Sequence, residues 1–112
     1  MKSDYVEALS NLGNVLREMD DIDAAIDAYK KVIQIKPNYS SGYNNLGVVL
    51  KEKGQFEQAI QAFGKALELN PSNAESHFNL GSIYLACEQV DQALHAFQEA
   101  IKINSKYAKA HH

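Results

Sequence analysis

The residues in this sequence that could do chemistry are few and poorly placed for it. Nucleophilic catalysis needs a thiolate with a base beside it, and the single cysteine, Cys87, has two candidate bases in His77 and His95. His77 lies ten residues earlier on the same predicted helix, about 15 Å away along its axis. His95 lies on the next helix in a phase occupied elsewhere by Asp27 and Gln61, which predicts a solvated position. Because a helix C-terminus disfavours a thiolate, we interpret Cys87 as a packing residue at a helix end.

An acidic run is the other feature that could bind an ion. Its members are Asp20, Asp21, Asp23 and Asp27. The glycine-containing spacing of a calcium loop is absent, and acids at a helix start cap free amides and complement the helix dipole. The terminal His111 and His112 are interpreted as a weak nickel-binding pair or a tag remnant. The sequence therefore predicts no catalytic residue, no metal site and no cofactor, and we expect the chain not to be an enzyme.

A repeat of 34 residues organises the chain, and its helices would hold any site in place. The recurring positions are Asn11-Leu12-Gly13, Asn45-Leu46-Gly47 and Asn79-Leu80-Gly81, then Ala25, Ala59 and Ala93, then Tyr29, Phe63 and Phe97. A fixed period of this length indicates stacked supersecondary units, none of which buries its apolar face alone. The repeats run over 6–39, 40–73 and 74–107, within a single domain spanning 1–112.

Each repeat contains two helical patterns. In the second half of repeat two the apolar residues fall on one helical stripe, made of Phe56, Ala59, Ile60, Phe63 and Leu67. Gly54 marks the turn between the halves, and Pro37 and Pro71 end the second helices. Ser72 with Glu75 predicts a capping box for the next helix. Six antiparallel helices are expected at 4–19, 22–35, 40–53, 56–69, 74–87 and 90–103, with no strands.

The small residues of the repeat predict close helix crossings. Neighbouring axes lie about 8–10 Å apart, which leaves little room for side chains. The glycines and alanines that recur would mark these crossings, and the recurring aromatic rings would fill wider gaps between repeats.

The third repeat departs from the others at its end. Ser105 stands where the first two repeats have Pro37 and Pro71. Residues 108–112 resemble the opening of a fourth repeat, so we expect a truncated stub there. Ser105 either caps a short helix that folds over Phe97 and Ile101, or the last helix runs on and leaves that stacking face bare. An uncovered apolar face predicts end-to-end association between copies.

This unit resembles the tetratricopeptide repeat. Leu-Gly on the first helix, alanine and an aromatic on the second, and a closing proline carry the resemblance, which covers 102 of 112 residues. Departures are Leu9, Tyr43 and His77, where the family often has Trp, and Val32 and Ser105. The resemblance implies an all-α solenoid of αα-hairpins wound as a right-handed superhelix. It also implies that the first helices line a concave groove that holds partner peptides.

The resemblance places a set of polar and apolar side chains in the groove. They are Asn11, Asn14, Arg17, Asn44, Asn45, Val48, Lys51, Phe78, Asn79, Ser82 and Leu85. The recurring Asn11, Asn45 and Asn79 can each pair with both N–H and C=O of a peptide unit. Spaced by about 10 Å, they would grip an extended peptide about every third residue. This ladder is similar to that of the O-linked N-acetylglucosamine transferase and the kinesin light chain. The alternative is that these amides only support neighbouring backbone.

Two further modes of groove binding differ in how well the sequence fits them. The carboxylate clamp of the family is rejected, because Ser10, Glu75 and Asn79 stand where its cations would be, and the predicted groove carries about −2 net charge. The apolar end formed by Phe78, Leu85, Ala86 and Val48 is interpreted either as an anchor pocket or as a surface covered by whatever follows.

Composition narrows the class of partner. The net charge is −3, and a nucleic-acid binder normally shows a basic face. No run approaches the roughly 20 apolar residues that span a bilayer, and residues 1–5 lack the apolar core of a signal peptide, so we expect a cytoplasmic protein. The leading hypothesis is a protein–protein interaction scaffold that binds an extended peptide. The alternatives are a self-assembly module that stacks through its ends, and a targeting segment of a larger enzyme.

Overall fold

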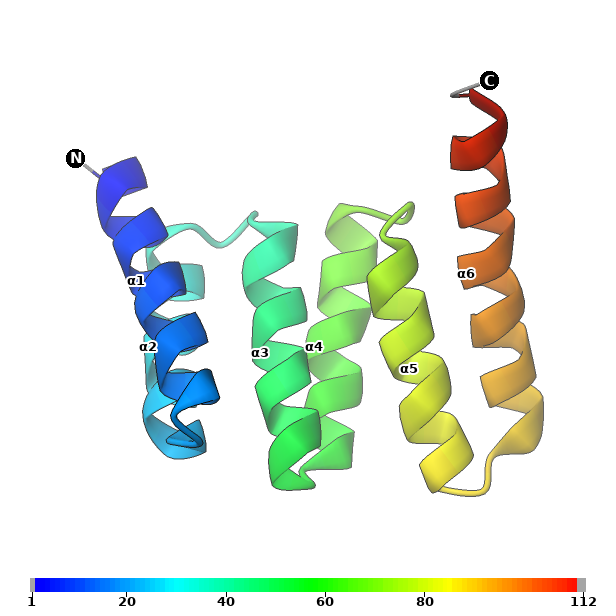
Figure 1. Ribbon diagram of the computed structural model, residues 1–112, viewed down its shortest axis with the longest axis horizontal. Coiled ribbons are helices and arrows are strands. Elements are labelled where there is room, and N and C mark those ends of the chain that lie inside the picture. The colour runs from blue at the N-terminus through cyan, green and yellow to red at the C-terminus, as the bar shows by residue number, and fades with distance from the viewer. Residues whose placement is uncertain (1, 111–112) are drawn as a thin grey trace.

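The chain folds into a row of helical hairpins. The computed structural model describes the backbone of residues 2–110 and the side chains of residues 5–104; His111 and His112 lie outside this range. Its helices are α1 (Lys2–Glu18), α2 (Ile22–Ile35), α3 (Ser40–Lys53), α4 (Phe56–Leu69), α5 (Ala74–Ala86) and α6 (Val90–Ala110). They pair in sequence as α1 with α2, α3 with α4 and α5 with α6, and the pairs stand side by side (Figure 1).

Contacts between consecutive hairpins make this row a solenoid. Helix α2 packs on α3, and α4 packs on α5, so each hairpin buries its apolar face against the next. No strand occurs within residues 2–110. The predicted all-α solenoid of αα-hairpins is thereby confirmed.

The ends of the second helices follow the proline pattern. Lys36 and Asn70 leave helical geometry with ψ of 81° and 88°, as expected for residues that precede proline. Helix α6 meets no proline, because Ser105 takes that place, and it continues to Ala110. The predicted end at residue 103 is therefore wrong, and of the two expected outcomes the last helix runs on.

The turns between helices are alike in all three repeats, although only one holds glycine. Gly54 ends α3 with φ of +87°, the left-handed geometry that closes many helices. Asp20 and Glu88, one repeat before and after, also have positive φ, at 64° and 62°. A non-glycine residue is strained there, which the sequence pattern did not reveal.

The start of α5 differs from the predicted capping box. The side chain of Asn73, not Ser72, accepts a hydrogen bond from the backbone N–H of Ser76 at 3.2 Å. Ser72 lies in the preceding turn, where its own N–H donates to the Asn70 side chain at 3.3 Å. The helix begins one residue later than a Ser72 cap requires, so the Ser72–Glu75 box is wrong.

The recurring glycines receive the recurring rings. A Cβ at Gly47 would lie 2.7 Å from the Phe63 ring, and Gly13 and Gly81 meet Tyr29 and Phe97 in the same way. Each ring therefore lies against the glycine of its own hairpin, which corrects the expectation that the rings fill gaps between repeats. The absence of a side chain on the first helix lets the ring of the second helix approach its backbone.

Candidate functional site

A polar hollow lies between the first and second repeats. Its volume is about 460 Å³, and its lining residues are Val6, Glu7, Ser10, Asn11, Asn14, Lys36, Tyr39 and Asn45. The structure thus brings together three of the asparagines that the sequence placed in a groove. One acidic and one basic side chain, Glu7 and Lys36, lie on its wall, so the hollow has mixed polarity without a net charge.

The hollow also contains residues that the sequence analysis did not place in the groove, among them Lys36 and Tyr39. Lys36 and Tyr39 lie in the connection between α2 and α3, and the Lys36 Nζ stands 4.7 Å from the centre of the Tyr39 ring. The contact is a cation–π interaction. The sequence did contain a signal for them, because Lys36 and Tyr39 flank Pro37 and Asn38 in the predicted connection between helices. This connection leads into the start of α3, so it lies at the end of the molecule where α1 and α3 begin.

The three asparagines of the predicted ladder are not equally open. Asn11 is exposed and Asn45 is half-buried, whereas Asn79 is only 8% exposed. The Nδ2 of Asn79 is buried and has no hydrogen-bond partner among the described residues. An unsatisfied buried donor costs about 1–3 kcal/mol. Access to the ladder therefore falls from repeat one to repeat three.

Asn14 has a partner within the protein. The hydroxyl of Tyr29 donates a hydrogen bond to its Oδ1, which joins α1 to α2. Burial raises the pKa of the Tyr29 hydroxyl above its usual value, although the charge of Arg17 opposes this. The carbonyl of Asn14 is thus occupied, and its amide N–H groups are the part that remains to face a ligand.

Asn44 was predicted to line the groove, but the structure buries it. Its side chain is 5% exposed, and its Oδ1 accepts a hydrogen bond from Ser76 Oγ at 2.7 Å. Within repeat two, Ser40 Oγ donates a hydrogen bond to the carbonyl of Ala66 on α4 at 2.9 Å. Asn44 therefore holds repeats two and three together, and we leave it out of the candidate site.

Arg17 is engaged by an acid of the next repeat. Its Nε donates to Glu52 Oε1 at 2.7 Å, and Nη2 lies 2.7 Å from the same oxygen. This hydrogen bond raises the pKa of Arg17 above its usual range, against the opposing effect of burial. The pair joins α1 to α3 and neutralises the charge of Arg17, which the sequence analysis assigned to the groove.

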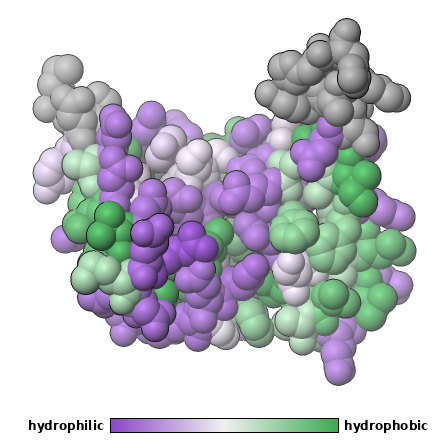
Figure 2. Space-filling model, in the orientation of Figure 1, coloured by the Kyte–Doolittle hydropathy of each residue, from purple (hydrophilic) through white to green (hydrophobic). Residues whose placement is uncertain are grey.

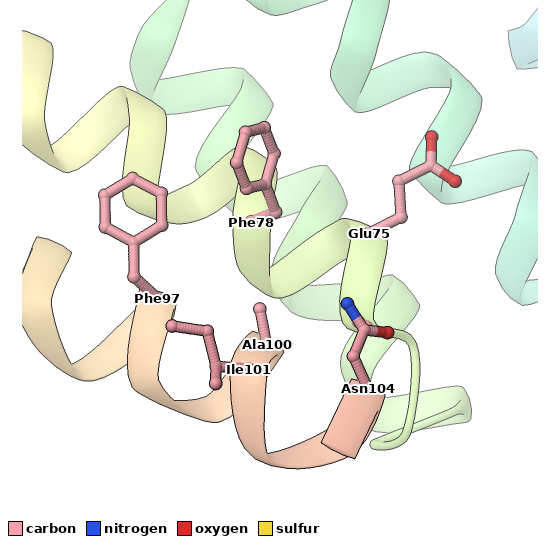
Figure 3. A pocket seen from close by; sticks show the side chains of 7 residues that line it. Glu75, Phe78, Phe97, Ala100, Ile101 and Asn104 are labelled. Atoms are coloured by element: carbon pink, nitrogen blue, oxygen red, sulfur yellow. The ribbon is translucent and has the colours of Figure 1, made fainter. Parts of the chain in front are cut away.

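The residues of the predicted apolar end do not form one surface, because Phe78 lines a hollow from which Leu85 and Val48 are absent. Phe78 on α5 is exposed and packs edge-to-face against Phe97 on α6, with ring centres 5.7 Å apart. Both rings line a second hollow of about 480 Å³, whose other residues are Ala74, Glu75, Ala100, Ile101 and Asn104 (Figure 3). Leu85, Val48, Lys51 and Ser82 do not line it. Figure 2 shows hydrophilic residues over the middle of the viewed face, and hydrophobic residues on either side, toward α5 and α6 and over α1.

Cys87 and His95, two of the candidate catalytic residues, are both exposed. Cys87 is exposed at the end of α5, so its position at a helix end was predicted correctly but its packing role was not. His95 is exposed, as predicted. Within the part of the chain that the structure describes, no three His, Cys, Asp or Glu side chains are grouped as metal ligands. None of the helices described has the length and apolar content that crossing a bilayer requires.

Comparisons with known proteins agree with this architecture. A family model described as "TPR repeat" matches residues 13–54 and 49–86, and one described as "Tetratricopeptide repeat" matches residues 74–107. A comparison with curated proteins gave no match. Among solved structures 234 chains match. One of them, from the crystal structure of MamA, has a TM-score of 0.89 and 30% sequence identity. The alignment covers 93% of this chain and 61% of that one, so this chain spans about three fifths of the MamA chain.

Proposed function

Because this chain belongs to the tetratricopeptide repeat family, whose members are generally non-enzymatic protein-binding scaffolds, we propose that it binds an extended peptide segment of a partner protein. The binding site is the polar hollow between repeats one and two. The observation that carries this proposal is the convergence of Asn11, Asn14 and Asn45 on that hollow, which is about 460 Å³ in volume.

Asparagine side chains suit recognition of a peptide backbone. Each carboxamide offers two donors and one acceptor, so the open amides of Asn11 and Asn45 can pair with the N–H and C=O groups of an extended segment. Asn14 contributes donors only, because its carbonyl accepts from Tyr29. Such contacts give affinity that depends little on side-chain sequence. Glu7 and Lys36 then favour a segment with complementary charges at its two ends.

The bound segment extends from this hollow toward repeat three. Asn79 Nδ2 has no partner among the described residues, and a peptide carbonyl is the kind of acceptor that would satisfy it. Beyond it, exposed Leu85 offers an apolar contact, while Val48, Lys51 and Ser82 supply mixed contacts between. The gain from satisfying Asn79 is available only if local side chains move to uncover it.

The test is a binding comparison between matched variants. Peptides selected from a displayed random library on this chain are titrated against the wild type and against Asn11→Ala/Asn45→Ala/Asn79→Ala. We expect the triple variant to keep its helical circular dichroism and to bind at least ten-fold more weakly, about 1.4 kcal/mol. Gln58→Ala/Gln61→Ala is the control, because both amides are exposed on α4 and lie outside the polar hollow.

Two results would contradict the proposal. One is a selected peptide that binds the triple variant as tightly as it binds the wild type. The other is a peptide whose affinity falls with the Gln58/Gln61 control instead, since that would place recognition on α4.

A second candidate function is self-assembly through the two ends of the array. It is favoured by exposed apolar side chains on the first and last hairpins, among them Leu12, Val15, Leu94 and Ile101. Exposed apolar patches of this kind mark interaction surfaces in many proteins.

A further inference from the structure

The first helix exposes residues that the other repeats bury. Leu12 and Val15 on α1 are 49% and 54% exposed, whereas Leu46 and Val49, their counterparts one repeat later, are 6% and 0% exposed. In repeat three, Leu80 is also buried. These positions on α3 and α5 face the preceding hairpin, because α3 packs on α2 and α5 packs on α4. Helix α1 therefore presents one half of an inter-repeat interface without its other half.

The last helix presents the complementary half. Ile101 on α6 is 64% exposed, whereas its counterparts Ile33 and Leu67 are half-buried. Leu94 is likewise exposed, although its counterpart Ile26 is buried. Ile101 lies on the wall of the hollow that also holds Phe78 and Phe97, and the close-up in Figure 3 shows these side chains around one opening.

Within the chain, the corresponding surface of each earlier hairpin is covered by the next helix, which has a small residue at the contact. In repeat two that residue is Gly42, where a Cβ would lie 3.0 Å from Ile33 Cγ2. In repeat three it is Ser76, which is wholly buried. The same position of α1 is Ala8, which is small and exposed. Helix α1 thus has a small residue at the same repeat position as α3 and α5, which is compatible with packing on the exposed surface of α5 and α6.

We propose that α1 of a second copy docks on the α5–α6 face of the first. It takes the register that α3 takes on the first hairpin and α5 on the second, which brings Ala8 of the incoming copy over Ile101. This inference rests on the second candidate function, self-assembly, and specifies its geometry. The contact joins two different surfaces, so a pair of copies still has one free α1 face and one free α5–α6 face. Further copies can therefore add head to tail, and the assembly does not close.

The geometry is tested by blocking one face at a time. Val15→Arg places a charge on the α1 face and Ile101→Arg places one on the α6 face; both positions are exposed, so folding should be retained. Light scattering across a concentration series should show the wild-type mass rising and each variant alone remaining a monomer. An equal mixture of the two variants should reach twice the monomer mass and no more, because one compatible pair of faces remains.

Controls separate loss of the interface from loss of the fold. Circular dichroism and thermal melting should match the wild type, and Leu12→Arg and Leu94→Arg replace any variant that fails this check. Gln61→Arg adds the same charge at an exposed position of α4 and should associate like the wild type.

The possible failures are distinguishable. A wild type that remains monomeric at millimolar concentration would overturn both self-assembly and this geometry. Association of Val15→Arg alone would mean that α6 faces pair with each other, and association of Ile101→Arg alone would mean that α1 faces do. Either result overturns the head-to-tail arrangement while self-assembly stands. A mixture that remains monomeric although the wild type associates also overturns it.

Discussion

At the scale of single residues, the turn at the end of each first helix carries unequal strain. Asp20, Gly54 and Glu88 occupy one position of the repeat and all have positive φ. A side chain in this region costs about 1–2 kcal/mol relative to glycine, although aspartate tolerates it better than glutamate does. The fold imposes the same backbone on three residues, and only one of them suits it.

Glu88→Gly should therefore stabilise the protein by about 1 kcal/mol, since glycine adopts this geometry without a steric penalty. Asp20→Gly should gain less. Urea unfolding monitored by circular dichroism measures both. Gly54→Glu makes the opposite substitution at the equivalent position of repeat two and should destabilise the protein by a similar amount. A gain in stability from Gly54→Glu would show that side chains do not strain this turn.

At the scale of helices, polar side-chain pairs connect one element to another. Tyr29 on α2 donates to Asn14 on α1, whereas repeat two has Phe63 and Val48 at these positions and repeat three has Phe97 and Ser82. The hydroxyl of Tyr29 is accommodated because a polar partner stands opposite it. Arg17 and Glu52 join α1 to α3 in a similar way. The Tyr29–Asn14 pair compensates for a local departure from the apolar pattern, because the other two repeats have phenylalanine in place of Tyr29.

The Tyr29 pair predicts a dependence on alkaline pH. Burial raises the folded-state pKa of Tyr29 above its value in the unfolded chain, so its contribution is full below about pH 10 and is lost as pH rises through the folded pKa. At neutral pH Tyr29→Phe should cost about 0.5–1.5 kcal/mol, because Asn14 loses its donor. Above about pH 10 the stability difference from wild type should shrink.

Urea unfolding of both proteins at neutral and alkaline pH measures this difference, and titration of the other groups cancels in it. Tyr29→Phe/Asn14→Val installs the pair found in repeat two and should be more stable than Tyr29→Phe at neutral pH, since no polar group is left unpaired. A stability difference that stays constant with pH would contradict the assigned role of the hydroxyl.

At the scale of the whole molecule, stability comes from stacking each hairpin on its neighbours. Ala59, Phe63 and Val49 in the middle repeat are wholly buried, and they belong to one continuous core with Ala25, Tyr29 and Ile83 from the outer repeats. Because hairpins contact only their neighbours, the middle repeat transmits cooperativity between the ends. Overpacking it should affect the entire array.

Ala59→Leu should destabilise the protein by about 1–3 kcal/mol, because the added atoms have no space in the core. Gln58→Leu, at the adjacent exposed position, should be nearly neutral. Chemical denaturation of the two variants gives the comparison. Equal losses would mean that α4 does not turn Ala59 toward the core and Gln58 toward solvent.

The repeat, the helices and most of their ends follow from the amino-acid sequence alone. The predicted bounds of α2, α3 and α4 agree with the structure, because Pro37, Pro71 and Gly54 act on the backbone locally. Ser105 indicated that the last helix could run on, but not that it does so, since a serine permits either a cap or a continuing helix.

Which side chains are available for binding depends on how the hairpins pack against one another. Asn11, Asn45 and Asn79 are identical in sequence phase but differ from exposed to buried, and Asn44 turns inward to meet Ser76. Periodicity identifies the face of one helix on which a residue lies. Exposure also depends on what the neighbouring hairpin places opposite it, and that contact joins residues about one repeat apart, such as Asn44 and Ser76, which no local pattern links.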